Sequence, residues 1–336
     1  MAWILPGCSE AGEAESGKPQ AVATVGMVGD LVRAVGGDLI DVTVLCPPGS
    51  DPHTYQVTSA DGRALEQADM IFYNGLHLEG TMQADLESLA GRKPVLAVAE
   101  TLSPELLRVD GEAIDPHVWM NPQLWAMALT SVEQFLALQY PEHADTFREN
   151  ADAYARKLAD LDAYARTAVA AVPEGQRLLV TAHDAFGYLG DAYGIEVRGI
   201  QGISTESEAS IADRNRLVDL VVERRVPAIF VESSVSDANV RAVVEDAKRR
   251  GHDLAVGGEL YSDAMGPAGM YEGTYLGMID HNVTTIVRAL GATNVNVHGL
   301  AGKLTLNHDH AAHAKEHDHA GHDHEHDHEH DHEEGH

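Results

Sequence analysis

The feature that most constrains the fold of this chain is an uninterrupted helical pattern near its middle. Between Pro141 and Val172 apolar side chains recur at helical spacing, and no glycine or further proline breaks the run. At 1.5 Å per residue, a helix of this length spans roughly 45 Å, which exceeds a typical helix of a globular protein. The pattern predicts one helical rod joining two parts of the chain, rather than a helical hairpin with a break.

Short apolar runs alternate with helical patterns on both sides of this rod. Such alternation is typical of βαβ units that build a parallel sheet. We therefore predict an α/β fold of two lobes, each a parallel β-sheet flanked by helices, joined by one long rigid α-helix. The predicted strands are 21–25, 41–45, 70–73, 94–98, 177–181, 195–197, 228–232 and 254–256, the predicted helices are 28–35, 82–89, 204–222, 237–250 and 274–290 with another around Leu65, and 257–263 is predicted as a loop.

The length of 336 residues favours more than one domain, because a single hydrophobic core rarely grows so large. The predicted division has five parts. They are a leader or lipoprotein linker (1–20), an N-terminal α/β lobe (21–140), the linking helix (141–172), a C-terminal α/β lobe (173–306) and a disordered His/Asp/Glu-rich tail (307–336).

The formal net charge of −30 limits the classes of partner. The tail contributes ten acidic residues and one lysine, and the rest of the chain is still strongly acidic. This balance argues against nucleic-acid binding and suits a protein that attracts cations. No run of 18 apolar residues occurs, so we expect no transmembrane helix.

Two cysteines, Cys8 and Cys46, are too few for a thiolate metal site of the Cys-x-x-Cys type or for a disulfide framework. The segment Ile4–Ser9, followed by a polar run, resembles the end of a bacterial lipoprotein signal, in which the cysteine becomes lipidated. Only a short apolar stretch without basic residues precedes it. Two interpretations stay open: Cys8 is lipidated and the natural start differs, or the likeness is accidental.

The tripeptide Asp-Pro-His occurs twice, at 51–53 and 115–117, each time in a predicted loop. Proline fixes its own φ near −65° and biases the residue before it towards an extended shape. The backbone that leads to each imidazole is therefore stiff. Asn121 and Pro122 then have the pattern of an N-cap and a first helical residue. Each histidine is a candidate metal ligand or catalytic group.

Four side chains are placed to form one site between the lobes. In open α/β sheets, ligands bind beyond the carboxyl ends of the strands. His53, His183 and Asp263 each follow a predicted strand, and His117 precedes the helix that starts at Asn121. Three neutral imidazoles and one carboxylate suit Zn²⁺, and they also suit Mn²⁺ if Asp263 binds through both oxygens. Taken singly, each of these residues is more often a surface or capping residue.

Six motifs together resemble the zinc and manganese solute-binding proteins of bacterial ABC importers, the TroA-like family. The motifs are Pro47–Tyr55, Asn74–Gly80, Asp115–Pro122, Thr181–Tyr188, Phe230–Ser234 and Leu260–Gly266. The likeness covers residues 21 to about 292 in order. It implies two α/β lobes on one long helix and places the four metal ligands at His53, His117, His183 and Asp263.

Other residues near these motifs are expected to have supporting roles. His77 lies near a strand end, and we expect a structural role in preference to metal contact. Glu206 and Glu208 are expected to open a helix as charge complements of its N-terminus. Trp119 and Tyr55 are expected to pack the ligand loops.

The expected function is high-affinity capture of Zn²⁺, or alternatively Mn²⁺, and its delivery to the membrane permease of an ABC importer. The ion is transported, so the protein is not an enzyme. We expect a monomer in the periplasm or at the outer face of the cytoplasmic membrane, tethered there if Cys8 is lipidated. The alternatives are a zinc-dependent hydrolase, which needs an open water position, and a surface adhesion protein. Metal affinity is expected to fall as pH drops through about 6.5.

The tail at 307–336 holds twelve of the twenty histidines, alternating with Asp and Glu. With almost no apolar side chains it is expected to be disordered and to hold Zn²⁺, Ni²⁺ or Cu²⁺ loosely. His324–His328 matches H-E-x-x-H but lacks the apolar helix of a metalloprotease. Removing the tail is expected to leave the affinity of the interlobe site nearly unchanged and to slow uptake when metal is scarce.

Overall fold

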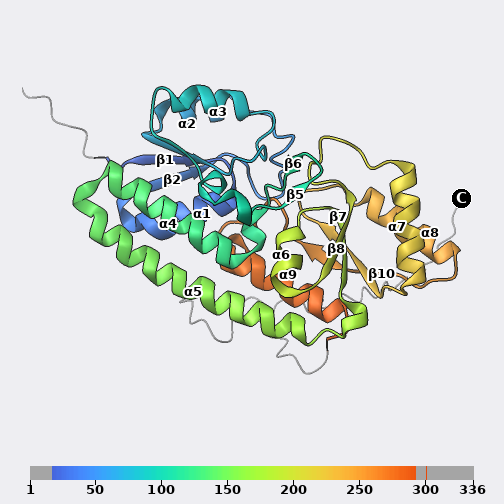
Figure 1. Cartoon of the computed structure of the whole chain (residues 1–336). Coiled ribbons are helices and arrows are strands. Elements are labelled where there is room, and N and C mark those ends of the chain that lie inside the picture. The colour runs from blue at the N-terminus through green and yellow to red at the C-terminus, as the bar shows by residue number, and fades with distance from the viewer. Residues whose placement is uncertain (1–16, 293–299, 301–336) are drawn as a thin grey trace, which may run out of the picture. The chain divides into compact units, whose positions relative to one another are not determined.

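A four-stranded parallel sheet forms the N-terminal half of the computed structural model, which describes residues 17–292 and Leu300 (Figure 1). The strand order is β2-β1-β3-β4. The central strands β1 and β3 are almost entirely buried, as their apolar sequences require. The strands are β1 (Gln20–Ala23), β2 (Asp41–Val44), β3 (Met70–Tyr73) and β4 (Val95–Ala97), and the helices between them are α1 (Gly26–Gly36), α2 (Ser59–Gln67) and α3 (Gln83–Ala90).

Two further pairs of parallel strands form the C-terminal half. β7 (Leu178–His183) pairs with β8 (Glu196–Gln201), and β9 (Ala228–Glu232) pairs with β10 (Ala255–Leu260). β7 also lies against β9. The helices of this half are α6 (Gly187–Tyr193), α7 (Ile211–Glu223), α8 (Ala238–Arg249) and α9 (Tyr275–Ala289), and a short antiparallel pair, β5 (Val109–Asp110) and β6 (Ala113–Ile114), precedes His117.

The long helix predicted from the sequence is α5 (Ala144–Ala170), whose 27 residues span about 40 Å. Its side chains are bonded to both halves of the fold. Asn150 Nδ2 donates to the carbonyl of Val35 on α1 at 2.9 Å, and the hydroxyls of Tyr164 and Thr284 on α9 share a 2.6 Å hydrogen bond. Figure 1 shows α5 running beside α4 (Pro122–Gln139) and continuing towards the C-terminal strands. The predicted fold class is therefore confirmed.

The apolar core follows the same arrangement. One cluster of buried side chains runs from β1 through α5 to α9, and a smaller one lies between β7 to β10 and the helices α7 and α8. The lobe boundaries expected at 140 and 173 stay a prediction.

The helix predicted over 204–222 is too long at its start. α7 begins at Ile211, and the Ser210 side chain caps it by accepting from Asp213 N. Thr205, which the helical pattern would include, instead donates through its hydroxyl to Asp51 at 2.5 Å. This contact between distant loops competes with helix formation, so Glu206 and Glu208 lie in a loop and do not open a helix.

The predicted loop at 257–263 was also partly wrong, because β10 continues to Leu260. Two glycines there indicated a turn, but they instead permit close packing and an irregularity within the strand. A Cβ at Gly257 would lie 2.7 Å from Phe230, so the strand can pack closely only with glycine. Gly258 has a φ of +139°, and the pairing register of β10 shifts between Val256 and Glu259.

Several expectations fall outside the described residues, including lipidation at Cys8 and the predicted disorder and metal binding of 307–336. In the part of the chain that the structure describes, no helix is both long enough and apolar enough to cross a membrane.

Candidate metal centre

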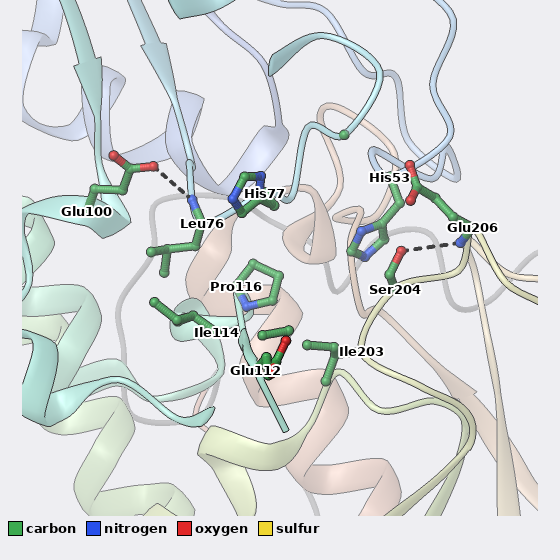
Figure 2. Close-up of a pocket in the computed structure, with 12 residues that line it drawn as sticks. His53, Leu76, His77, Glu100, Glu112, Ile114, Pro116, Ile203, Ser204 and Glu206 are labelled. Carbon is green, nitrogen blue, oxygen red and sulfur yellow. Dashed lines mark hydrogen bonds between the residues drawn. The ribbon is translucent and has the colours of Figure 1, made fainter. Parts of the chain in front are cut away.

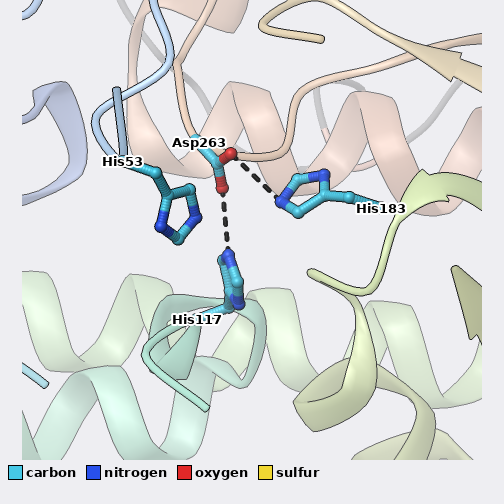
Figure 3. Close-up of side chains that lie close together, drawn as sticks. All are labelled: His53, His117, His183 and Asp263. Carbon is cyan, nitrogen blue, oxygen red and sulfur yellow. Dashed lines mark ion pairs between the residues drawn. The ribbon is translucent and has the colours of Figure 1, made fainter. Parts of the chain in front are cut away.

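The structure brings the four predicted site residues together (Figure 3). His53, His117, His183 and Asp263 each offer one ligand atom, and these atoms all lie within 4.8 Å of one another. All four side chains are buried, with no more than 2% of any residue exposed. His53 lies in the loop after β2, His117 before a short 3-10 turn, His183 at the end of β7, and Asp263 just after β10.

The ligand atoms converge on one another without forming ordinary hydrogen bonds. Asp263 Oδ1 lies 3.2 Å from His117 Nε2, and Asp263 Oδ2 lies 3.1 Å from His183 Nε2. Neither contact has hydrogen-bond geometry, and the buried His53 Nε2 also has no partner among the described residues. Buried polar atoms are rarely left unpaired in native proteins. The four side chains therefore form a group of ligand atoms that could hold a metal ion.

The two Asp-Pro-His loops have the same local geometry. Asp51 Oδ1 accepts from the backbone N–H of His53 at 2.9 Å, and Asp115 Oδ1 accepts from that of His117 at 3.0 Å. In each loop the aspartate and proline fix the histidine backbone through contacts only two residues long. Both predicted loops are therefore present, each with an aspartate that bonds to the backbone of its histidine.

The two loops differ in one respect: Asp115 contacts the imidazole ring of its histidine as well as the backbone. Its Oδ1 lies 2.8 Å from His117 Nδ1, which turns Nε2 towards the centre of the site. Its other oxygen lies 3.3 Å from Arg108 Nε. Asp51 instead accepts from the hydroxyls of Thr54 and Thr205, so the ring of His53 has no such anchor among the described residues.

Glu232, at the end of β9, holds the backbone and the ring of His183, as Asp115 holds those of His117. Its Oε1 accepts from the backbone N–H of His183 at 2.9 Å, and its Oε2 lies 2.5 Å from Nδ1 of the ring. β9 lies beside β7, so the fold brings the two strand ends together. Glu232 is 4% exposed, which keeps this pair away from solvent.

The electrostatics of the site depend on these carboxylates. Burial alone would lower the pKa of His117, but Asp115 and Asp263 override it and raise the pKa to about 9. Burial is likewise outweighed at His183, where Asp263 and Glu232 hold the pKa well above its ordinary value. Burial would raise the pKa of Asp263, but the two rings beside it hold that pKa well below its usual range.

His53 differs from the other two histidines in its charge. Burial lowers its pKa to about 4, and the nearby Asp263 only partly opposes this effect. Its imidazole is therefore neutral at physiological pH and ready to bind a cation without losing a proton.

A pocket of about 680 Å³ adjoins the cluster at His53 (Figure 2). Its wall includes His77, Glu112 and Glu206, so Glu206 faces this pocket and not a helix terminus. We call it the inlet pocket.

Sequence reasoning missed the residues that orient the rings. Asp115 was seen only as part of a stiff loop, and Glu232 only as part of a motif. A carboxylate two residues before a histidine is a signal that the sequence contained for Asp115. The pairing of Glu232 with His183 had no such local signal, because 49 residues separate them.

Trp119 was expected to pack the ligand loop, and it is fully buried with its ring 5.2 Å from that of His117.

Comparison with known proteins supports the same interpretation. The sequence model of the family described as "ZnuA: Zinc-uptake complex component A periplasmic" matches residues 21–289. The chain belongs to the ZnuA family. Members of this family are metal-binding substrate-binding proteins of ABC transporters and not enzymes, as the sequence predicted.

Individual relatives of this ZnuA-family chain carry the names of different metals. The manganese-binding lipoprotein MntA of Bacillus subtilis is 44% identical over 292 residues, which cover 86% of this chain and 95% of MntA. The zinc-binding protein TroA of Treponema pallidum is 45% identical over 278 residues, covering 82% and 90%. The solved structure of periplasmic TroA matches with a TM-score of 0.80 at 44% identity, covering 82% of this chain and all of that one.

Proposed function

We propose that this protein captures Zn²⁺ through His53, His117, His183 and Asp263 and delivers it to the permease of an ABC importer. The observation that carries the proposal is the convergence, from both halves of the fold, of buried ligand atoms that have no hydrogen-bond partner among the described residues. A cation at their centre would satisfy all of them at once.

The donor set favours Zn²⁺ over harder ions. Zn²⁺ binds four ligands in a tetrahedron, with nitrogen and oxygen ligands at about 2.0–2.1 Å, so such neighbouring ligand atoms stand about 3.4 Å apart. Asp263 Oδ1 lies 3.2 Å from His117 Nε2 and Asp263 Oδ2 lies 3.1 Å from His183 Nε2, so each of these histidine nitrogens stands close to that spacing from one of the two carboxylate oxygens. Four protein ligands also leave no position for a catalytic water, in keeping with a carrier.

Mn²⁺ is the second candidate, and Asp263 is the reason. Both of its oxygens are buried and accept no hydrogen bond from the described residues, so the carboxylate can bind through both and raise the coordination number. Oxygen ligands and higher coordination suit Mn²⁺. The similarity to MntA supports this candidate, as the similarity to TroA supports Zn²⁺.

The deciding experiment measures metal stoichiometry and competing affinities for Zn²⁺ and Mn²⁺. We would compare the full chain with a version lacking 307–336, because the histidine-rich tail can hold metal of its own. We expect one tightly bound ion in both forms, lost in the His117→Ala variant, with Zn²⁺ displacing Mn²⁺. Metal that disappears with the tail and persists in His117→Ala would overturn the proposal. Tighter binding of Mn²⁺ than of Zn²⁺ would support the four-residue site but identify Mn²⁺ as the ion that it carries.

The working location follows from the proposed delivery to a permease. We propose that the protein acts outside the cytoplasm as a monomer, held at the membrane if Cys8 is lipidated. Labelling with a radioactive fatty acid in cells, compared between the natural chain and Cys8→Ser, tests the anchor. Label that is equal in both would exclude Cys8.

A further inference from the structure

The four ligand side chains are buried, so a cation needs a route to reach them. His53 lines the inlet pocket and also belongs to the ligand cluster. In Figure 2 the ring of His53 points into the space bounded by His77, Pro116 and Ser204. His53 is 2% exposed, and its Nε2 has no hydrogen-bond partner in the described ranges.

The inlet pocket is large enough for a hydrated ion. A water molecule occupies about 30 Å³ of liquid, and the pocket, at about 680 Å³, is many times larger than that. The ligand cluster has no comparable space, because its atoms lie within 4.8 Å of one another. A cation must therefore lose its water between the pocket and the cluster, and groups on the pocket wall can replace that water in stages.

Two carboxylates on the wall are available for this role. The carboxylates of Glu112 and Glu206 make no hydrogen bond or ion pair with the described residues. Glu206 comes from the loop before α7, and its carboxylate lies against Gly80, where an added Cβ would be 2.7 Å from Oε1. Glu100 also lines the pocket, but it already accepts from the backbone N–H of Leu76 at 3.1 Å.

His77 adds an imidazole to the same wall. Gly75, Leu76 and His77 all have positive φ, at 82°, 55° and 64°. The buried carboxylate of Glu79 holds this turn by accepting from the N–H groups of Asn74 and Gly75 at 2.7 and 3.0 Å. The turn leaves the His77 ring exposed in the pocket (Figure 2), where no side chain among the described residues bonds to it.

His53 is the only one of the three ligand histidines whose ring lacks an anchor in the described structure. Asp115 and Glu232 fix the rings of His117 and His183. A ring held only by packing can turn about its side-chain bonds without breaking a hydrogen bond. It can therefore meet a cation in the pocket and follow it into the cluster.

We propose that the inlet pocket is the route by which a divalent cation reaches the ligand cluster, and that His77, Glu112 and Glu206 hold the ion transiently before His53 binds it. This inference rests on the proposed function. Carboxylate and imidazole together suit a partly hydrated divalent ion. Negative charge lining a cleft raises the local concentration of cations and their association rate.

The imidazole is tested with His77→Asn in the full-length protein. Asparagine tolerates the left-handed backbone at this position, so the turn is kept. The association and dissociation rates of Zn²⁺ are measured by stopped-flow tryptophan fluorescence, since Trp119 lies beside His117. A group on the route speeds passage in both directions. We therefore expect both rates to fall by the same factor, at least about threefold, with Kd unchanged.

A merely structural role for His77 predicts a different result. Disturbance of the cluster would raise the dissociation rate and weaken Kd, with the association rate unchanged. Either that result or two unchanged rates would overturn the role of His77.

The carboxylates are tested by the double variant Glu112→Gln, Glu206→Gln. Its matched control is Glu142→Gln, Glu174→Gln, which removes the same charge from exposed residues that do not line the pocket. We expect the first variant to bind Zn²⁺ roughly threefold to tenfold more slowly, with a weaker dependence of the rate on salt. The control should match the natural chain. Equal association rates in the two double variants would exclude steering by the pocket.

Failure of this inference is distinguishable from failure of the proposed function. If His183→Ala abolishes the bound ion while the pocket variants keep natural rates, the cluster is the metal site and the route lies elsewhere. If His183→Ala retains the ion at full affinity, the cluster is not the site and both proposals fail.

Discussion

The indole N–H of Trp119 donates a 3.0 Å hydrogen bond to the backbone carbonyl of Ser262, 143 residues away. Each partner stands beside a ligand loop, because Trp119 follows His117 by two residues and Ser262 directly precedes Asp263. The hydroxyl of Tyr275 adds a 2.7 Å bond to the carbonyl of Trp119. These contacts hold the two loops together by protein bonds alone.

Replacing Trp119 with Phe is expected to weaken metal binding as well as stability. The phenyl ring keeps much of the packing but leaves the buried carbonyl of Ser262 without its donor, at a cost of about 1–3 kcal/mol. Urea unfolding and Zn²⁺ competition measure the two effects. Trp125→Phe is the matched control, because the buried indole N–H of Trp125 has no partner in the described structure. A loss of Zn²⁺ affinity in Trp125→Phe equal to that in Trp119→Phe would show that packing, and not the hydrogen bond, couples the loops.

The two aspartates of the Asp-Pro-His loops should not be equivalent. Asp115→Asn weakens the hold on the His117 ring, and loss of such a partner typically costs about 10–100-fold in metal affinity. Asp51→Asn should cost far less, because within the described residues Asp51 bonds only to the backbone of His53 and to two threonine hydroxyls. Zn²⁺ affinities from chelator competition decide the matter. Equal losses in the two variants would show that the turn, and not the ring contact, is what matters.

Metal binding is expected to release close to two protons per ion at pH 7. The raised pKa values of His117 and His183 keep both rings protonated before the ion arrives, and a protonated ring cannot bind metal. Protons and metal therefore compete, and affinity rises with pH until these pKa values are passed. For His117 that point lies near pH 9, higher than the 6.5 expected from the sequence.

Calorimetry in buffers with different ionisation enthalpies counts the released protons. His53→Ala should leave the count unchanged, because the pKa of about 4 keeps His53 neutral. Asp115→Asn should lower the count towards one, since it removes one of the two carboxylates that raise the pKa of His117. A natural protein that releases fewer than one proton would contradict this electrostatic picture.

Gly199→Ala is expected to disturb the metal centre by displacing the backbone that carries His183. A Cβ at Gly199 on β8 would lie 2.4 Å from the backbone N of Asp184 and 2.6 Å from the carbonyl carbon of His183. The backbone of β7 must then shift, which we expect to cost about 1–3 kcal/mol and to weaken Zn²⁺ binding. Gly202→Ala, close by in the same segment, meets nothing within 4 Å and serves as the control. Thermal unfolding and Zn²⁺ titration of both variants test this, and unchanged affinity in Gly199→Ala would contradict it.

The sequence predicted most of the fold because its signals are local. The uninterrupted run after Pro141 led to α5, and Asn121 caps α4 by accepting from Gln123 N at 2.9 Å. The start of α7 was missed because Ser204, Thr205, Ser207 and Ser210 all resemble caps. A bond from Thr205 to Asp51 across the fold decided among them.

The four clustered residues were accessible from the sequence because each lies in a distinctive motif. Their second partners were harder to find. The contact of Glu232 with His183 and that of Trp119 with Ser262 depend on which strands and loops become neighbours. The positive φ at His77 is also set by distant groups, since Glu100 accepts from the N–H of Leu76, 24 residues earlier.

The turn at Asp115 has a consequence for how the protein acquires its binding ability during folding. A ring oriented by a carboxylate two residues away can be oriented early, before distant segments meet. The ring of His183 can be oriented only after β9 brings Glu232 beside it. Asp263 lies 146 positions beyond His117. A chain emerging in order from its N-terminus therefore has half a site long before it has a whole one. High affinity should appear only with the last elements to fold, so a tightly held ion would mark a finished molecule.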